Sequence, residues 1–330
     1  MHRALLLLAL LGLAASAGLL IALSSGSVEL DLKTLWSTLF HSDESLHRTV
    51  VWELRLPRAL SAFATGGLLA LGGALMQVLL RNPLADPYIL GVSGGASAAA
   101  LTVLVLGLSG LWLPVGAFTG AMFSMLLVFG LSHGRGGWTP TRLLLTGVVV
   151  AAGWGALISL LLAISPEGAL RGMLFWLMGD LGYARSPWLG LTVLALGLTA
   201  TLPLARDLNV LARGELLAGS LGVAVKRLRY QLFLLASLLT AAAVTLAGSV
   251  GFVGLVVPHM LRLVGAHDHR VLLPGSVLLG GTLLMIADTG ARTLIAPAQL
   301  PVGVITALVG VPLFLLLLHR GSQHLAAVRG

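Results

Sequence analysis

The sequence predicts an all-α membrane protein, folded as a single bundle of about ten transmembrane helices across residues 1–330. Hydrophobic residues make up 57% of the chain and charged residues only 10%, which is more apolar surface than a soluble domain buries. Apolar runs such as residues 56–79 far exceed the roughly ten alternating residues of a membrane β-strand. The 42 glycines suit close packing between membrane helices.

The first span lies within residues 1–24, with its apolar run starting at residue 4. The triplet Ala15-Ser16-Ala17 is also typical of a signal-peptide cleavage site. Because the run continues past this triplet to Leu23, we expect a retained helix. Nine further spans follow, of which the eighth overall is too short to cross a bilayer unaided: residues 56–79, 91–109, 112–131, 142–164, 187–204, 229–249, 254–265, 272–289 and 301–318.

An even number of spans places both termini on one side of the membrane, which we take as the cytoplasm. The inner loops and tails then hold twelve basic and four acidic residues, whereas the outer ones hold seven basic and eight acidic residues. This agrees with the rule that basic residues gather on the cytoplasmic side. It also accounts for the net charge of +8 through contact with membrane lipid, without a nucleic-acid partner.

The longest inner segment covers residues 205–229 and is rich in leucine, glycine and charged residues. Its leucines are spaced so that short helices would each present an apolar face, with glycines allowing turns between them. Such a segment could lie on the inner leaflet. It could equally be a docking surface for a cytoplasmic protein, and composition leaves both alternatives open.

Five segments together resemble the FecCD-type permeases of binding-protein-dependent ABC importers. They are the 205–229 segment and the stretches RNPLADPYILGVSGGAS, GFVGLVVPHMLRL, DHRVLLPGS and LPVGVITALVGVPLF, which occur in the family's order between about Leu54 and Leu318. The resemblance implies a transport subunit of the bacterial inner membrane rather than an enzyme. The chain contains no GxxxxGK[ST] phosphate loop, so ATP would be used by a separate ATPase, with no cofactor bound directly to this chain.

The same resemblance implies a homodimer that works with two cytoplasmic ABC ATPases and one periplasmic or lipoprotein substrate-binding protein. The mechanism expected is alternating access at the dimer interface. The family carries ferric siderophores, haem or cobalamin, and ferric siderophore is placed first because it is the commonest cargo. An ion-driven secondary transporter is the alternative, although the spans contain few of the ionisable residues that it would need.

The resemblance also implies roles for residues on the inner side and along the path. ATPase coupling is expected at Arg213, Gly214, Glu215, Leu216, Ala218, Gly219, Leu221 and Gly222. The translocation path or gate is expected at Asn82, Pro83, Gly91, Ser93, Gly94, Gly95 and Thr141. The glycines would leave room for a bulky chelate. A pair of adjacent hydroxyl residues forms the inner gate in cobalamin-carrying members, and Pro140 replaces the first of them here. A helix N-terminus is the alternative interpretation of Thr139-Pro140-Thr141.

Three arginines on the predicted outer side are candidates for docking the substrate-binding protein: Arg55, Arg58 and Arg292. They match arginines that pair with acidic residues of the binding protein in cobalamin-carrying members of the family. The alternative is that they anchor helix ends at the membrane surface. Asp288 is expected to neutralise a neighbouring base such as Arg292.

The remaining polar residues are expected to be structural. His259 and Arg262 would close the short eighth span. His267-Asp268-His269 is expected to be a solvated inner loop rather than a metal site, because adjacent residues converge poorly on one ion.

Overall fold

The computed structural model describes residues 2–26, 30–40, 46–108, 110–133, 139–183 and 186–327. Within these ranges the chain is helical and contains no strand, as predicted. All ten predicted spans are present: α1 (His2–Ser24), α4 (Leu56–Leu79), α5 (Val92–Val105), α6 (Trp112–Ser132), α7 (Pro140–Ile164), α9 (Trp188–Thr201), α12 (Val225–Ala247), α13 (Val253–Leu263), α14 (His269–Thr293) and α15 (Val302–Ala327).

Seven helical stretches of the described chain are long and apolar enough to cross a membrane. The other three spans, α5, α13 and residues 302–316, are shorter apolar helices. The span predicted for α5 was too long. Gly107 takes a left-handed backbone (φ +66), and the helix ends before residue 109. The short eighth span is confirmed as α13.

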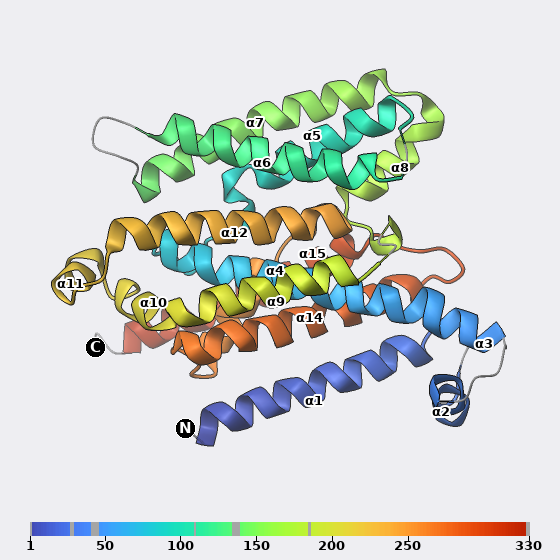
Figure 1. Cartoon of the computed structure of the whole chain (residues 1–330), viewed down its shortest axis with the longest axis horizontal. Helices are drawn as coiled ribbons and strands as arrows, with labels where there is room; N and C mark the ends of the chain where they lie inside the picture. The colour runs from blue at the N-terminus through green and yellow to red at the C-terminus, as the bar shows by residue number, and fades with distance from the viewer. Residues whose placement is uncertain are drawn as a thin grey trace.

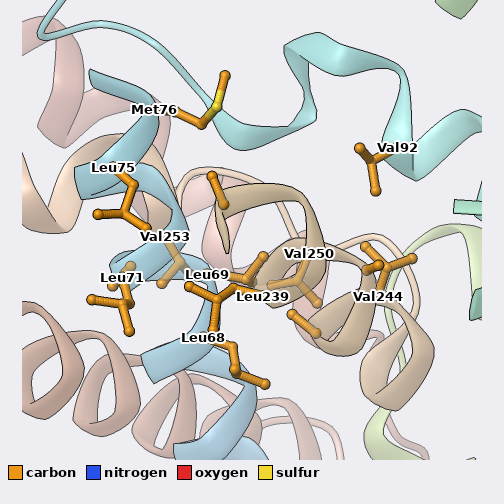
Figure 2. Packing of buried hydrophobic residues seen from close by; sticks show 14 of the residues in the cluster. Leu68, Leu69, Leu71, Leu75, Met76, Val92, Leu239, Val244, Val250 and Val253 are labelled. Atoms are coloured by element: carbon orange, nitrogen blue, oxygen red, sulfur yellow. The ribbon is translucent and has the colours of Figure 1, made fainter. Parts of the chain in front are cut away.

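Helix α4 forms the centre of the bundle. It lies within the helical stretch Leu46–Leu79, and 89% of the most apolar 18 residues of that stretch are buried. It packs against α14, α12, α13 and α9. Figure 2 shows Leu68, Leu71 and Leu75 of this helix within the core cluster. Two close helix crossings depend on glycine: a Cβ on Gly66 would overlap the Gly280 carbonyl, and one on Gly73 would overlap the Gly254 carbonyl.

The helices are arranged in layers, which can be followed in Figure 1. Helices α5, α6 and α7 form one layer, α12 lies next to it, and α4, α9 and α14 follow, with α1 packed on α14. Of the most apolar 18 residues of α1 only 6% are buried, and of those of α7 only 11%. Both helices therefore expose most of their apolar surface. Lipid or another membrane helix must cover these faces.

The two ends of the bundle carry different short helices. The start of α1, the end of α15 and the helices α10 (Ala205–Leu211) and α11 (Glu215–Ser220) lie at one end (Figure 1). The helices α2 (Leu32–Phe40), α3 (Leu46–Thr49) and α8 (Glu167–Leu177) lie at the opposite end. This arrangement agrees with an even number of crossings. We call the end with α10 and α11 the inner end, following the charge pattern.

Candidate functional site

The inner end presents an apolar surface on α11. The sequence predicted apolar faces on both short helices, and the two differ in where those faces point. Helix α10 buries Leu208 and Leu211, whereas Leu216 of α11 is 93% exposed and Leu221 is 63% exposed. Leu217 is 44% exposed on the same helix. Helix α11 therefore presents an apolar face at the inner end of the bundle that the described part of the chain does not cover.

Helix α11 is nevertheless tied to the bundle on its other side. Ala218 is fully buried, and the flanking Gly214 (φ +131) and Gly222 (φ +82) adopt backbone conformations that favour glycine. Glu215 forms ion pairs with Arg81 at 3.6 Å and with Arg229 at 3.4 Å. A displacement of α11 would therefore act on the turn after α4 and on the N-terminal part of α12.

Two further residues of the predicted coupling surface lie in open positions. Arg213 is exposed between α10 and α11. A Cβ added at Gly219 would meet no other atom within 4 Å. A larger side chain at position 219 would thus leave the fold of this chain intact and would change only what can approach it.

A polar turn connects α4 to α5. The Asn82 side chain accepts a hydrogen bond from the backbone N–H of Leu84 at 2.9 Å, beside the exposed Pro83. Asp86 accepts from the backbone N–H of Tyr88 at 2.8 Å and caps the 3-10 turn η2 (Pro87–Leu90). Burial raises the pKa of Asp86 to about 6. The turn is thus held by its own side chains, as expected of irregular backbone next to a membrane.

The start of α5 uses its glycines for packing. A Cβ on Gly94 would lie 2.8 Å from Cβ of Trp154, and a Cβ on Gly95 would overlap the Gly120 carbonyl. Gly91 has φ +67 and its carbonyl accepts a hydrogen bond from the Ser124 hydroxyl at 2.7 Å. Gly94 and Gly95 thus allow close approach of α7 and α6, and their role in the translocation path stays a prediction.

Ser93 and Thr141 are the other predicted path residues. The Ser93 hydroxyl is 2.8 Å from the Ser249 hydroxyl, so this bond joins α5 to the segment before α13. Thr141 is exposed in the first turn of α7, where Thr139 is the N-cap and accepts from the backbone N–H of Arg142 at 3.3 Å. The helix-start interpretation is confirmed for this segment, and a gate role for Thr141 stays a prediction.

At the outer end, the Asp288 carboxylate forms ion pairs with two of the three predicted docking arginines. Its side chain is 1% exposed, and it accepts from Nε of Arg58 at 3.0 Å and from Nη2 at 2.9 Å. Nε of Arg292, one helical turn away, lies 3.2 Å from the same carboxylate. The expected pairing of Asp288 with Arg292 is confirmed. Arg58 also contacts Gln299 at 3.1 Å and lies 3.9 Å from Asp180.

Arg55 is positioned differently. It ends a π-helix (Val50–Arg55) that leads into α4 and that the sequence did not predict. The residue is only 4% exposed, and Nη1 donates to the backbone carbonyls of Leu23 at 2.6 Å and Ser24 at 3.0 Å. It satisfies carbonyls at the C-terminal end of α1. All three arginines thus have internal partners, with which any docking protein would compete.

Two polar contacts at the inner end were missed or misjudged from the sequence. The solvated-loop expectation is wrong for His269, which is only 3% exposed and contacts Asn209 through Nδ1 at 2.6 Å. Arg262 donates to the side chain of the buried Gln77, which supports its expected structural role. Neither partner could be found from sequence spacing, because Asn209 and Gln77 come from distant segments.

Comparisons with known proteins agree with these arrangements. Residues 13–320 match the FecCD transport family. The hemin transport system permease protein HmuU of Yersinia pestis is 42% identical over 91% of this chain and 91% of its own length. The vitamin B12 import system permease protein BtuC of Escherichia coli O127:H6 is 40% identical over 83% of this chain and 84% of its own length.

A solved structure has the same architecture. It is an inward-facing conformation of a metal-chelate type ABC transporter, with a TM-score of 0.83 and 33% identity. The match covers 95% of this chain and 98% of that chain. The arrangement of all ten spans is therefore that of an ABC permease.

Proposed function

The chain belongs to the FecCD transport family of ABC permeases, and we propose that it imports an iron chelate or a corrinoid with energy from a separate ATPase. The observation that carries the proposal is the surface of α11, where Leu216 is 93% exposed at the inner end. A protein that docks on α11 would remove these apolar side chains from water. An ATPase is the partner that a transport permease of this family requires.

The ion pairs of Glu215 supply a route for coupling. An ATPase that moves α11 would pull on Arg81 and Arg229, and hence on the turn after α4 and on α12. Because α4 is the central helix, a shift there changes its packing against α14 and α13. Rigid helices that slide against one another are an established way of alternating between two states.

A homodimer is part of the proposal. Most of the apolar surface of α7 is not covered by other helices of the chain. Leu145, Val148 and Val149 are all more than half exposed. A second copy would cover part of such a surface and enclose a path between the two chains. Two ATPases would then dock at the inner end, and one substrate-binding protein at the outer end.

The cargo is proposed by class. Relatives are named for hemin and vitamin B12, and the similar solved structure for a metal chelate. All three are metal complexes. We place ferric siderophore first among the cargoes to be tested, followed by haem and cobalamin.

At the outer end, Arg58 and Arg292 are proposed to receive acidic residues of the binding protein. Their side chains are 15% and 10% exposed and share the single carboxylate of Asp288. Arg58 also forms a longer ion pair with Asp180 at 3.9 Å, so an acidic residue of the partner would replace Asp180 and form a closer pair with Arg58. Arg55 would contribute indirectly, by holding α1 against the start of α4.

The experiment is transport in proteoliposomes that contain the purified chain, its ATPase and its binding protein. We expect uptake of a ferric siderophore only with ATP and only with the binding protein present. Uptake by this chain alone, driven by a proton or sodium gradient, would instead establish the ion-driven transporter and overturn the proposal.

A further inference from the structure

The short helix α2 (Leu32–Phe40) lies at the outer end and runs across the direction of the spans. Figure 1 shows α2 almost end-on, whereas α1 and α4 extend across the view. Asp31 begins the helix, because its carboxylate accepts from the backbone N–H of Thr34 at 3.0 Å. Helix α2 therefore lies along the membrane surface and does not cross the bilayer.

One face of α2 fixes it to the bundle. Leu35 is only 2% exposed and forms a cluster with Leu23 of α1 and Val51 of the π-helix before α4. The backbone carbonyl of Thr38 accepts from Nε1 of Trp52 at 3.3 Å. These contacts set the rotation of α2 about its own axis, and hence which of its side chains point away from the bundle.

The opposite face of α2 is aromatic and uncovered. Trp36 and Phe40, one helical turn apart, are each 65% exposed, and their ring centroids are 4.4 Å apart. Lys33, also exposed, precedes Trp36 by three residues and so lies on the same face. The described part of the chain leaves this aromatic face open. Exposed apolar side chains that lie together in this way indicate a contact outside the chain.

The packing of α2 on α1 sets its depth in the membrane. Helix α1 has 23 residues, which gives a length of about 35 Å and slightly exceeds the hydrocarbon core of about 30 Å. Leu35 packs beside Leu19 and Leu23, in the last two turns of α1. Helix α2 therefore lies where α1 leaves the hydrocarbon, at the level of the lipid headgroups.

Lipid is favoured over a docking protein as the partner of this face, because the face continues an apolar surface that already meets lipid. Only 6% of the most apolar 18 residues of α1 are buried, so lipid covers this side of the bundle. The side-chain chemistry agrees. Tryptophan is enriched at membrane interfaces, and the long apolar stem of a lysine such as Lys33 allows its ammonium group to reach the headgroups.

We propose that α2 is an interfacial helix whose Trp36 and Phe40 insert into the outer leaflet, at the boundary between headgroups and acyl chains. Lys33 lies beside the lipid phosphates. The partner is the lipid surface itself and not one particular lipid. This contact holds the outer end of α1, which packs mainly on α14, at a fixed depth.

The chain contains no cysteine, so a single nitroxide label can be placed in the full chain without other substitutions. The test is electron paramagnetic resonance of labelled Trp36→Cys and Phe40→Cys in nanodiscs of phosphatidylcholine and phosphatidylglycerol. The label's collisions are measured with oxygen, which concentrates in lipid, and with a water-soluble nickel chelate. The lipid reference is Leu13→Cys, 67% exposed in the middle of α1, and the water reference is Glu167→Cys, exposed at the outer end.

We expect the ratio of oxygen to nickel collisions at both positions to be several-fold higher than at Glu167→Cys and lower than at Leu13→Cys. The two positions should also lie at the same depth. A helix directed along the membrane normal would instead separate them by about 6 Å, since each residue rises about 1.5 Å. Both side chains are exposed, so the labelled variants should keep the Tm of the wild-type chain in detergent.

Three results would overturn the proposal. The first is nickel access at positions 36 and 40 equal to that at Glu167→Cys, which would place the aromatic face in water. The second is a depth difference of about 6 Å between the two labels, which would exclude an orientation along the surface. The third is immobilisation of both labels only when the substrate-binding protein is added, which would assign the face to that protein.

Discussion

At the scale of single residues, the polar groups of this chain are paired by contacts that join distant segments. Asp288 holds Arg58 and Arg292, Glu215 holds Arg81 and Arg229, and each carboxylate thus connects separate helices. Hydropathy places each of these residues near an end of a span, but it does not say which ones meet. Only the charge balance of Asp288 with Arg292, one turn apart, could be predicted from spacing.

Asp288→Asn should destabilise the chain by about 3 kcal/mol, because two largely buried arginines would lose their common carboxylate. The measurement is the unfolding free energy in detergent. Glu167→Gln is the matched control, since it neutralises an exposed outer acid and should change stability by less than about 0.5 kcal/mol. Equal stability of the two variants would show that the buried ion pairs do not stabilise this end.

Asp86 leads to a prediction about pH. Its pKa is about 6 in the folded chain, above the roughly 3.9 of an unfolded aspartate, so the folded state binds the proton more readily. Its contribution to the unfolding free energy is therefore greatest below about pH 4 and falls as the pH rises to about 6. Asp86→Asn keeps the cap on Tyr88, so it should be more stable than wild type at pH 7 and lose this pH dependence. An unchanged pH profile would contradict the burial of this carboxyl.

At the scale of helices, the spans could be predicted and their ends could not. The ten apolar runs all became helices, because a bilayer leaves a long apolar segment no other way to satisfy its backbone. The π-helix before α4 was missed, since its residues Val50–Arg55 show no pattern that distinguishes it from α-helix. The leucines of α10 and α11 were similarly spaced, yet only those of α10 are buried, a difference set by the neighbouring helices.

Close helix crossings supply a prediction at this scale. Gly73→Ala should lower stability by about 1–3 kcal/mol or prevent folding, because the added methyl group would overlap the backbone of Gly254 in α13. Gly12→Ala in α1 is the matched control, since a Cβ there meets no atom within 4 Å. The folded yield and the Tm in detergent measure both. A Gly73→Ala chain as stable as wild type would mean that α4 and α13 are not packed this closely.

At the scale of the whole molecule, the bundle has one end for the termini and α11, and another for the outer arginines. The sequence predicted this arrangement from the distribution of basic residues, and the candidate sites follow from it. The sequence could not predict the polar pocket at the inner end of α4. The residues that line this pocket come from four segments that only the folded chain brings together.

The orientation in the membrane can be tested with reporters. A cytoplasm-active reporter fused to the C-terminus should be active, and a periplasm-active one fused at Ser165, between α7 and α8, should also be active. The basic residues at the inner end provide the physical reason. The reverse pattern at either position would require the opposite orientation or a different number of crossings.

The central claim is that α11 transmits the action of an ATPase to the membrane helices. The most direct measurement compares ATP hydrolysis and cargo uptake in proteoliposomes for wild type, Leu216→Asp and Leu111→Asp. Both leucines are strongly exposed, at 93% and 80%, but they lie on different segments, so both variants should fold normally. The account predicts that Leu216→Asp abolishes uptake, and with it the stimulation of hydrolysis by the binding protein, while Leu111→Asp keeps both. Wild-type uptake by Leu216→Asp, with normal stimulation of hydrolysis, would contradict the account.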